Sequence, residues 1–304
     1  MPAKRYQDFQ DWVNLAARER AESIKQLNEL PSPDLHLTFD WEENRTTLDA
    51  RNPNRKAILT GRSENDARLV DEALYGSGLR LTRTGYARVE NAHGSSFDSK
   101  HPRTWLAQIH APRVFAGSEG PVLAMTEKDT LRGYRIMLED TGRGQDFRIS
   151  FQLMLDRDQE LGIEVVSGSV IEPREPVRIG VSWDGSHRAD GVGIYVNGEV
   201  VKTTVLMDNL DSPIISELPL LIGSRAEKDA REFLRDATLN NGIIDDVQIF
   251  DESLTPPQIA KLSTAEPIDS LLANLRRSAR KALEIEWISQ DIEGRKLLNE
   301  SAAK

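Results

Sequence analysis

The chain has 304 residues, 49 acidic and 39 basic side chains, a formal net charge of −10 and no cysteine. The acidic balance argues against a nucleic-acid-binding surface, which is usually basic, and the lack of cysteine excludes disulfides and thiolate zinc sites. No run of about 18 apolar residues occurs, so no membrane span is expected. The length suits one large domain with appendages.

Residues 1–33 are predicted to form an N-terminal helical extension. Tyr6, Phe9, Val13 and Ala16 recur at spacings of three and four, as on one face of a helix, and the prolines of LPSPD end this pattern. The opening stretch MPAKRYQDFQDW lacks the apolar core of a signal peptide. In a segment of a longer protein, that lack would say little about where the parent protein resides.

Residues 34–264 are predicted to form an antiparallel β-sandwich. Apolar side chains alternate with polar ones over 147–155 and over 177–183, which is the period of half-buried strands. Asn197-Gly198 is a two-residue hairpin signal of type I′. Strand candidates recur about every 8–15 residues with no long helix among them, which favours an all-β sandwich over a βαβ fold.

Residues 265–304 are predicted to form a C-terminal helical extension, in which Leu271, Leu272 and Leu275 belong to an apolar stripe. The termini of such sandwiches often lie close together. We therefore expect the two extension helices to pack against each other or along the sandwich. The alternative is that each is a linker that folds only against neighbouring domains, because such narrow stripes do not stabilise an isolated helix.

The second half of the sandwich contains, in this order, VSWDG (181–185), GIYVNGEVV (193–201), LPLLIGS (218–224) and GIIDDVQIFDESLTPPQIAKL (242–262). Their order and spacing resemble the C-terminal half of a laminin-G-like, concanavalin A-like domain. In the first half, LHLTFD (35–40) resembles the first strand of such domains, YGSGLRLTRTGYARV (75–89) the strand pair that follows, and TWLAQI (104–109) an apolar strand. The resemblance implies a jelly-roll fold for residues 34–264 and excludes the helices.

A helix before and a helix after such a domain resembles the arrangement in large exported proteins of the planctomycete type. In those proteins a laminin-G-like domain is inserted between cytochrome-c-associated domains. This resemblance depends on FQDWV (9–13) and on the Leu/Arg-rich C-terminal helix. It implies that the chain belongs to a larger periplasmic, cell-surface or extracellular protein, whose haem motif would lie outside the chain.

Two adjacent aspartates, Asp245 and Asp246, interrupt a β-branched strand. If Val247 and Ile249 face the core, strand alternation places Asp245 inward and Asp246 toward water. An inward ionised carboxylate needs a hydrogen-bonded partner or a cation. Backbone N–H groups or an arginine would meet that need without a metal.

The family resemblance implies a structural calcium ion at Asp245, because a matching aspartate helps to bind calcium in many concanavalin A-like domains. The remaining ligands would come from the first strand, where Asp40 and nearby carbonyl groups are available. Calcium takes about six to eight oxygen ligands, so Asp40 and Asp245 are the identifiable part of a larger set.

A carbohydrate-binding surface usually presents exposed aromatic rings, and aromatic residues make up only 6% of this chain. Trp183 is predicted to be core by its alternation. The remaining candidates for stacking against a sugar are Trp41, Tyr86, Trp105, Tyr134 and Tyr195. Tyr195 is out of phase with Ile194 and Val196, so it is expected on the outer or concave face of its sheet.

The candidate catalytic motifs are not convincing. EKDARE (227–232) formally fits the Glu-x-Asp-x-x-Glu pattern of a retaining glycosidase family of the same fold, but charged and small residues stand where apolar ones should separate the carboxylates. No histidine spacing suggests zinc, and no Gly-x-Ser-x-Gly elbow occurs.

The sequence therefore predicts a non-catalytic binding or interaction module of a larger exported protein, with a carbohydrate or glycoprotein as its ligand. The first alternative is a structural spacer that docks neighbouring domains. The second, a glycoside hydrolase, is disfavoured by its imperfect motif. No nucleic-acid partner is expected.

Overall fold

The computed structural model describes residues 30–40, 42–70, 73, 77–82, 84–94, 96–112, 120–141, 146–168, 171–173, 176–225 and 238–264. Within these ranges, Pro31–Thr264 belongs to one compact unit. The helices predicted for residues 1–33 and 265–304 lie outside the described residues, as does Trp41. The pairing of those helices therefore stays a prediction.

Sheet A is the smaller of the two large antiparallel sheets in the described part of the chain. Its eight strands are β1 (Leu35–Leu37), β4 (Ala67–Val70), β5 (Gly78–Leu81), β8 (Arg103–His110), β13 (Pro176–Trp183), β14 (Val192–Val196), β15 (Glu199–Val200) and β19 (Ile243–Phe250). They follow the order β15-β14-β13-β8-β19-β5-β4. Strand β1 pairs with the C-terminal half of β19. The first and last strands of the domain are thus neighbours.

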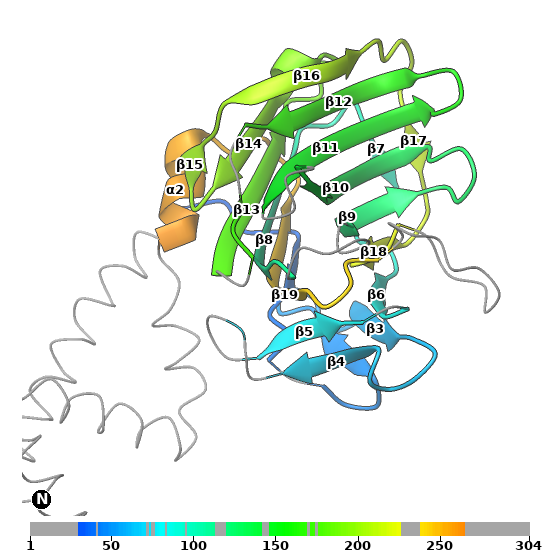
Figure 1. Cartoon of the computed structure of the whole chain (residues 1–304), viewed down its shortest axis with the longest axis vertical. Helices are drawn as coiled ribbons and strands as arrows, with labels where there is room; N and C mark the ends of the chain where they lie inside the picture. Colours follow the sequence, from blue (N-terminus) through cyan, green and yellow to red (C-terminus); the bar gives the residue numbers. More distant parts are fainter. Residues whose placement is uncertain are drawn as a thin grey trace, which may run out of the picture. The chain divides into compact units, whose positions relative to one another are not determined.

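Sheet B is the larger antiparallel sheet and lies against sheet A (Figure 1). Its nine described strands are β2 (Thr46–Leu48), β3 (Lys56–Thr60), β6 (Tyr86–Val89), β9 (Gly120–Thr126), β10 (Gly133–Asp140), β11 (Phe147–Asp156), β12 (Leu161–Ser167), β16 (Thr203–Asp208) and β18 (Leu220–Ile222). The order is β16-β12-β11-β10-β9-β18-β6-β3-β2. A separate short pair joins β7 (Phe97–Asp98) to β17 (Ile215–Ser216).

The two large sheets bury one apolar core between them, as the period-two pattern predicts. In β11, the side chains of Phe147, Ile149, Phe151 and Leu153 are fully buried. Trp183 is also fully buried, as its alternation predicts. This confirms the predicted all-β, antiparallel jelly-roll sandwich. The predicted strand pair of residues 75–89 is divided, because β5 lies in sheet A and β6 in sheet B.

The predicted hairpin turn at Asn197-Gly198 joins β14 to β15. Both residues have positive φ, 51° for Asn197 and 83° for Gly198, as a type I′ turn requires. Gly198 also lies close to the last helix, because a Cβ at this position would be 2.9 Å from the Cα of Ala260. Glycine thus serves both the turn and the contact.

One helix of the described chain, α2 (Pro256–Thr264), follows the last strand and covers part of the outer face of sheet A. A short 3₁₀ turn, η1 (Ala189–Gly191), precedes β14. Beneath α2 lies a second, small apolar cluster of Leu106, Tyr195, Phe250, Leu254 and Ile259. None of the described helices is long and apolar enough to cross a membrane.

Strand β19 contains a β-bulge at the adjacent aspartates. Asp245 pairs with Gln108 of β8 and Gln248 pairs with Leu106, so three steps along β19 match two along β8. Asp246 has a φ of 45°, which is unusual for a residue with a side chain. The bulge lets Ile244, Val247 and Ile249 all join the main core. Strict alternation therefore fails within this strand.

Candidate functional site

Asp246 is buried, and the prediction that it faces water is wrong. Its exposed fraction is 6%, close to the 4% of Asp245. One of its oxygens lies 2.5 Å from Nε2 of His36, and the other forms an ion pair with Arg178. Gln248 also donates to this carboxylate, at 3.0 Å. The bulge causes the error, because it turns the extra residue into a polar cluster on sheet A.

Asp245 is buried, as predicted, and accepts a hydrogen bond from the backbone N–H of Asp246 at 2.7 Å. Asp40, the other predicted calcium ligand, accepts one from the N–H of Ser77 at 3.2 Å. Gly78 follows Ser77 in the chain, and a Cβ added to Gly78 would lie 3.5 Å from the Cβ of Asp245. Both carboxylates thus lie along the same short stretch of backbone.

These carboxylates do not by themselves make a calcium cage. The described residues contain no group of three or more His, Cys, Asp or Glu side chains that could hold a metal ion. Calcium takes about six to eight oxygens, and backbone N–H groups already bind one oxygen of each aspartate. Calcium binding at Asp40 and Asp245 stays a prediction.

The aromatic candidates that the structure describes are buried. The exposed fractions are 6% for Tyr86, 1% for Trp105, 0% for Tyr134 and 4% for Tyr195. Trp105 and Tyr134 pack against each other in the main core, with ring centroids 4.9 Å apart and ring planes inclined at 42°. Tyr195 does face outward from its sheet, as its phase predicts, but it packs in the small cluster beneath α2. These rings have no free face for a sugar.

A loop between β2 and β3 provides a different candidate site, built around Asp49. The Asp49 side chain is fully buried and accepts from the backbone N–H groups of His36, at 3.0 Å, and Arg51, at 2.9 Å. Its second oxygen accepts from Nε of Arg55 at 2.7 Å. Asp49 thus fixes the loop to β1 at one end and to Arg55 at the other.

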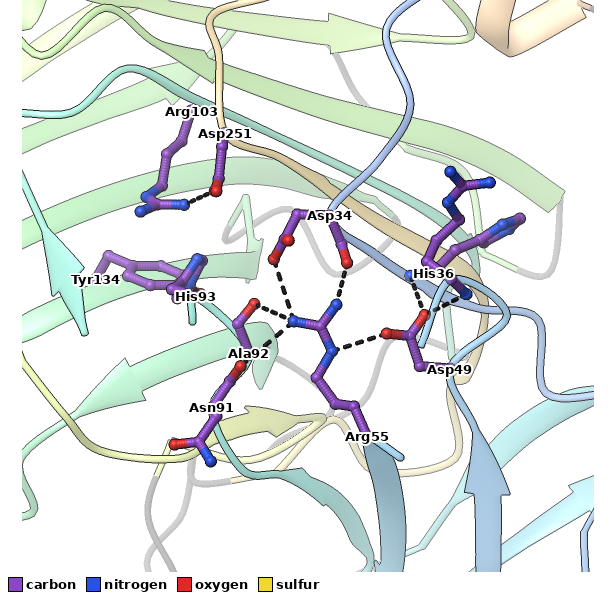
Figure 2. Close-up of polar contacts among 11 residues, drawn as sticks. Asp34, His36, Asp49, Arg55, Asn91, Ala92, His93, Arg103, Tyr134 and Asp251 are labelled. Carbon is purple, nitrogen blue, oxygen red and sulfur yellow. Dashed lines mark hydrogen bonds and ion pairs between the residues drawn. The ribbon is translucent and has the colours of Figure 1, made fainter. Parts of the chain in front are cut away.

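Arg55 connects this loop to two other parts of the chain (Figure 2). Its NH1 group donates to Oδ2 of Asp34 at 3.1 Å and to the carbonyl oxygens of Asn91 and Ala92 at 3.3 and 3.2 Å. Its NH2 group donates to the Asp34 carbonyl. Because the guanidinium group is planar and rigid, these bonds hold three segments in one arrangement.

A surface pocket of about 700 Å³ opens beside Arg55. That volume is in the range of small-ligand sites, about 300–1,000 Å³. Its walls come from the start of the domain, the β2–β3 loop and the turn after β6; the lining residues are Pro33, Asp34, Arg51, Asn52, Asn54, Arg55, Lys56, Ile58, Glu90, Asn91 and Gly94. We call it the Arg55 pocket.

The rim of the Arg55 pocket presents polar side chains to solvent. Arg51, Asn54, Lys56 and Asn91 are all exposed. Figure 2 shows the Asn91 carboxamide pointing away from the Arg55 guanidinium, whereas the Asn91 carbonyl binds it. Amide and charged groups held on a rigid frame can hydrogen-bond a ligand without first being ordered. The pocket is therefore suited to a polar ligand.

Sequence reasoning missed this pocket. Periodicity locates strands, whereas the pocket depends on contacts between residues 34, 49–56 and 90–94, which are distant in the sequence. One signal was present: RNPN (51–54) is dense in turn-forming residues between two strands. That pattern indicates a loop, and it cannot indicate what the loop contacts.

Two further groups of reactive side chains have structural roles. Ser99 Oγ lies 3.0 Å from Nε2 of His187, but Ser99 is fully buried and also accepts from the N–H of Ile214 at 2.9 Å. A catalytic serine must reach its substrate, so this pair joins loops. Nε2 of His93 lies 2.6 Å from the Tyr134 hydroxyl in the core, where burial lowers the pKa of His93 and raises that of Tyr134.

A charged ladder crosses strands β10, β11 and β12 of sheet B. Nε2 of Gln152 donates to Glu164 at 2.8 Å and to Glu139 at 3.4 Å, and Glu139 accepts from Arg148 at 3.0 Å. Burial and the neighbouring Glu139 raise the pKa of Glu164. Glu139 and Glu164 are thus bridged by one amide group.

Similarity to known proteins agrees with the fold. A profile of the concanavalin A-like lectin/glucanases superfamily matches residues 90–260, more than half of the 304-residue chain. No curated protein matches the chain. Domain 4 of AbnA, an extracellular arabinanase from Geobacillus stearothermophilus, solved in complex with arabinotriose, has a TM-score of 0.51 and 15% identity, covering 78% of this chain and 100% of that one.

Two toxin domains have the same fold. The binding domain of Paraclostridial Mosquitocidal Protein 1 has a TM-score of 0.53 and 14% identity, covering 76% of this chain and 51% of that one. The botulinum neurotoxin serotype C1 binding domain has a TM-score of 0.55 and 15% identity, covering 77% and 52%. The chain thus matches about half the length of each toxin domain. On the profile match, the chain belongs to the concanavalin A-like lectin/glucanases superfamily.

Proposed function

We propose that this chain is a non-catalytic binding module of a larger exported protein and that it recognises carbohydrate, free or on a glycoprotein, through the Arg55 pocket. The observation that supports this proposal is the pocket itself, with a fixed floor around Arg55 and exposed amide and charged groups on its rim. Sugars present many hydroxyl groups, which such side chains can bind in fixed directions.

The similar structures support a binding role over a catalytic one. Two are binding domains of toxins, and the third is a domain of an extracellular arabinanase in complex with a trisaccharide. The pair expected of a retaining glycosidase, Glu227 and Glu232, lies outside the described residues. Export of the parent protein is part of the same proposal.

Asn91 provides a sharp test. Its φ is 51°, a backbone conformation that glycine adopts without strain. Asn91→Gly therefore removes the carboxamide and keeps the carbonyl group that binds Arg55. On a glycan array, we expect the native protein to bind defined glycans and Asn91→Gly to lose about fivefold or more in affinity.

The matched control is Asn44→Gly. Asn44 also has a positive φ, 52°, and is exposed, but it lies outside the pocket. It should bind like the native protein. A blank array with the native protein would reject carbohydrate recognition, and equal losses in both variants would reject the pocket as the site.

One observation favours the spacer function as the second candidate. Arg178 forms the ion pair with Asp246, which contacts His36 of β1, and its NH1 group also donates to the carbonyl oxygen of Leu262 in α2 at 2.6 Å. One arginine therefore links the first strand of the sandwich to its last helix. A module with its ends tied together in this way would hold neighbouring domains close to each other, and a blank glycan array would favour this function.

A further inference from the structure

The charges on the rim of the Arg55 pocket are unevenly compensated. Asp34 is paired with Arg55, and Glu90 accepts a hydrogen bond from Arg88. Among the described residues, by contrast, neither the Arg51 guanidinium nor the Lys56 ammonium group has an ion-pair partner, and both side chains are exposed. Arg55 is shared between Asp34 and the buried Asp49. Arg51 and Lys56 are therefore the cations of this pocket that pair with no described carboxylate.

The backbone that carries these two cations is held in place. The backbone N–H of Arg51 binds Oδ1 of Asp49, and Lys56 follows Arg55 directly at the start of β3. In a chain with a net charge of −10, such a site would repel most anions unless the local groups were cationic. A local pair of free cations at a pocket therefore favours a ligand that carries negative charge.

We propose that the Arg55 pocket selects anionic glycans, in which a carboxylate or sulfate group is bound by Arg51 and Lys56 and the hydroxyl groups are bound by Asn54 and Asn91. This inference rests on carbohydrate binding at the same pocket and names its ligand class. Guanidinium groups suit carboxylate and sulfate oxygens because they donate two parallel hydrogen bonds, and the ammonium group adds a second positive charge.

The test compares pairs of polysaccharides that share a backbone and differ in charge. Polygalacturonate and its fully methyl-esterified form share one backbone, and dextran sulfate and dextran form the second pair. Calorimetry should show tighter binding of the charged member of at least one pair, with an affinity that falls as salt rises from about 50 to 500 mM. Which pair responds distinguishes a carboxylate from a sulfate ligand.

Substitutions then show which side chains cause the preference for the charged ligand. Arg51→Met and Lys56→Met should each weaken the binding of the charged member by about fivefold and weaken the binding of the neutral member by a smaller factor. Lys56→Arg should retain binding. Lys100→Met replaces an exposed lysine outside the pocket and should bind like the native protein. Circular dichroism would verify that each variant is folded.

The outcomes separate the two proposals. Equal affinity for charged and neutral members, unchanged in both methionine variants, would overturn anion selection while leaving carbohydrate binding in place. Salt-sensitive binding that survives both methionine variants would place the anion site elsewhere and also overturn this inference. No binding to any polysaccharide or array glycan would overturn both proposals.

Discussion

Arg178 and Asp246 form an ion pair across strand β8, which lies between their own strands, β13 and β19. Both side chains are buried, with exposed fractions of 6% and 8%. The bulge at Asp246 makes this contact possible, because it directs the extra residue of β19 into the polar cluster on sheet A. A buried charge of this kind requires its partner.

We expect Asp246→Asn to lower the free energy of unfolding by about 3–5 kcal/mol, because it leaves the Arg178 charge buried without its anion. Urea unfolding would measure the change. Arg178→Met combined with Asp246→Asn should recover part of the loss. The control is Asp190→Asn, in the exposed pair Arg188–Asp190, which should cost less than about 1 kcal/mol. A similarly small cost at Asp246 would contradict the burial argument.

Asp49 tests whether the frame of the pocket is needed for binding. Asp49→Ala removes the acceptor of three hydrogen bonds, from His36, Arg51 and Arg55. We expect a loss of about 1–3 kcal/mol in the free energy of unfolding, as for other buried groups left unsatisfied, together with weaker glycan binding. Asp129→Ala, in the exposed turn between β9 and β10, is the control. Full glycan affinity in Asp49→Ala would show that the ligand binds elsewhere.

His93 should make stability depend on pH. Burial, followed by the charges of Arg103 and Arg55, lowers its pKa well below the ordinary 6.5. The unfolded chain therefore binds more protons at His93 than the folded chain does. The free energy of unfolding should have its full value above pH 6.5 and should fall as the pH decreases below 6.5.

His93→Gln should reduce this loss between pH 7.5 and pH 5, as measured by urea midpoints at each pH. The same pH dependence in native protein and His93→Gln would be the contrary result.

Glu164 should change the pH dependence of stability in the direction opposite to His93. Burial and the Glu139 charge raise its pKa above the ordinary 4.5, so the folded chain binds more protons there than the unfolded chain does. Its ionisation therefore costs stability as the pH rises through the raised pKa. Glu164→Gln should raise the melting temperature at pH 7, and the gain should shrink near pH 4. Glu217→Gln, at an exposed position, is the control; a lower melting temperature in Glu164→Gln would contradict the argument.

Calcium binding at Asp40 and Asp245 is also open to test. Titration of EDTA-treated protein with calcium should give stoichiometric heat and a higher melting temperature, because an ion that binds the folded state stabilises it. Asp245→Asn should abolish both effects. If EDTA-treated native protein gives neither heat nor a shift in melting temperature, the calcium prediction fails.

Sequence reasoning predicts the strands of this fold well and their exceptions poorly. The alternation over 147–155 and 177–183 identifies β11 and β13, because both strands have one face in the core. The same rule misplaces Asp246, since a one-residue bulge reverses the phase of a strand without changing its composition. The phase of Tyr195 is correct, but alternation gives no sign that α2 covers its face.

The candidate site could be predicted only in part. Exposed aromatic residues would have been the signal of a sugar site, but the described candidates are buried, and Trp105 and Tyr134 belong to the main core because large rings contribute most to its burial. The Arg55 pocket depends on one arginine that joins Asp34, Asp49 and the carbonyl groups of residues 91 and 92. Such contacts leave no periodic pattern in a sequence.

In the β2–β3 loop, the side chains that hold the loop conformation differ from those that are exposed to solvent. Asp49 and Arg55 point inward and hold its conformation, while Arg51, Asn54 and Lys56 extend outward with no side-chain bond to the frame among the described residues. Side chains at these three positions can therefore be varied without removing a side-chain hydrogen bond of the frame. The loop is a ready starting point for a library of new binding specificities, and natural variation at the same positions would let one scaffold acquire different ligands.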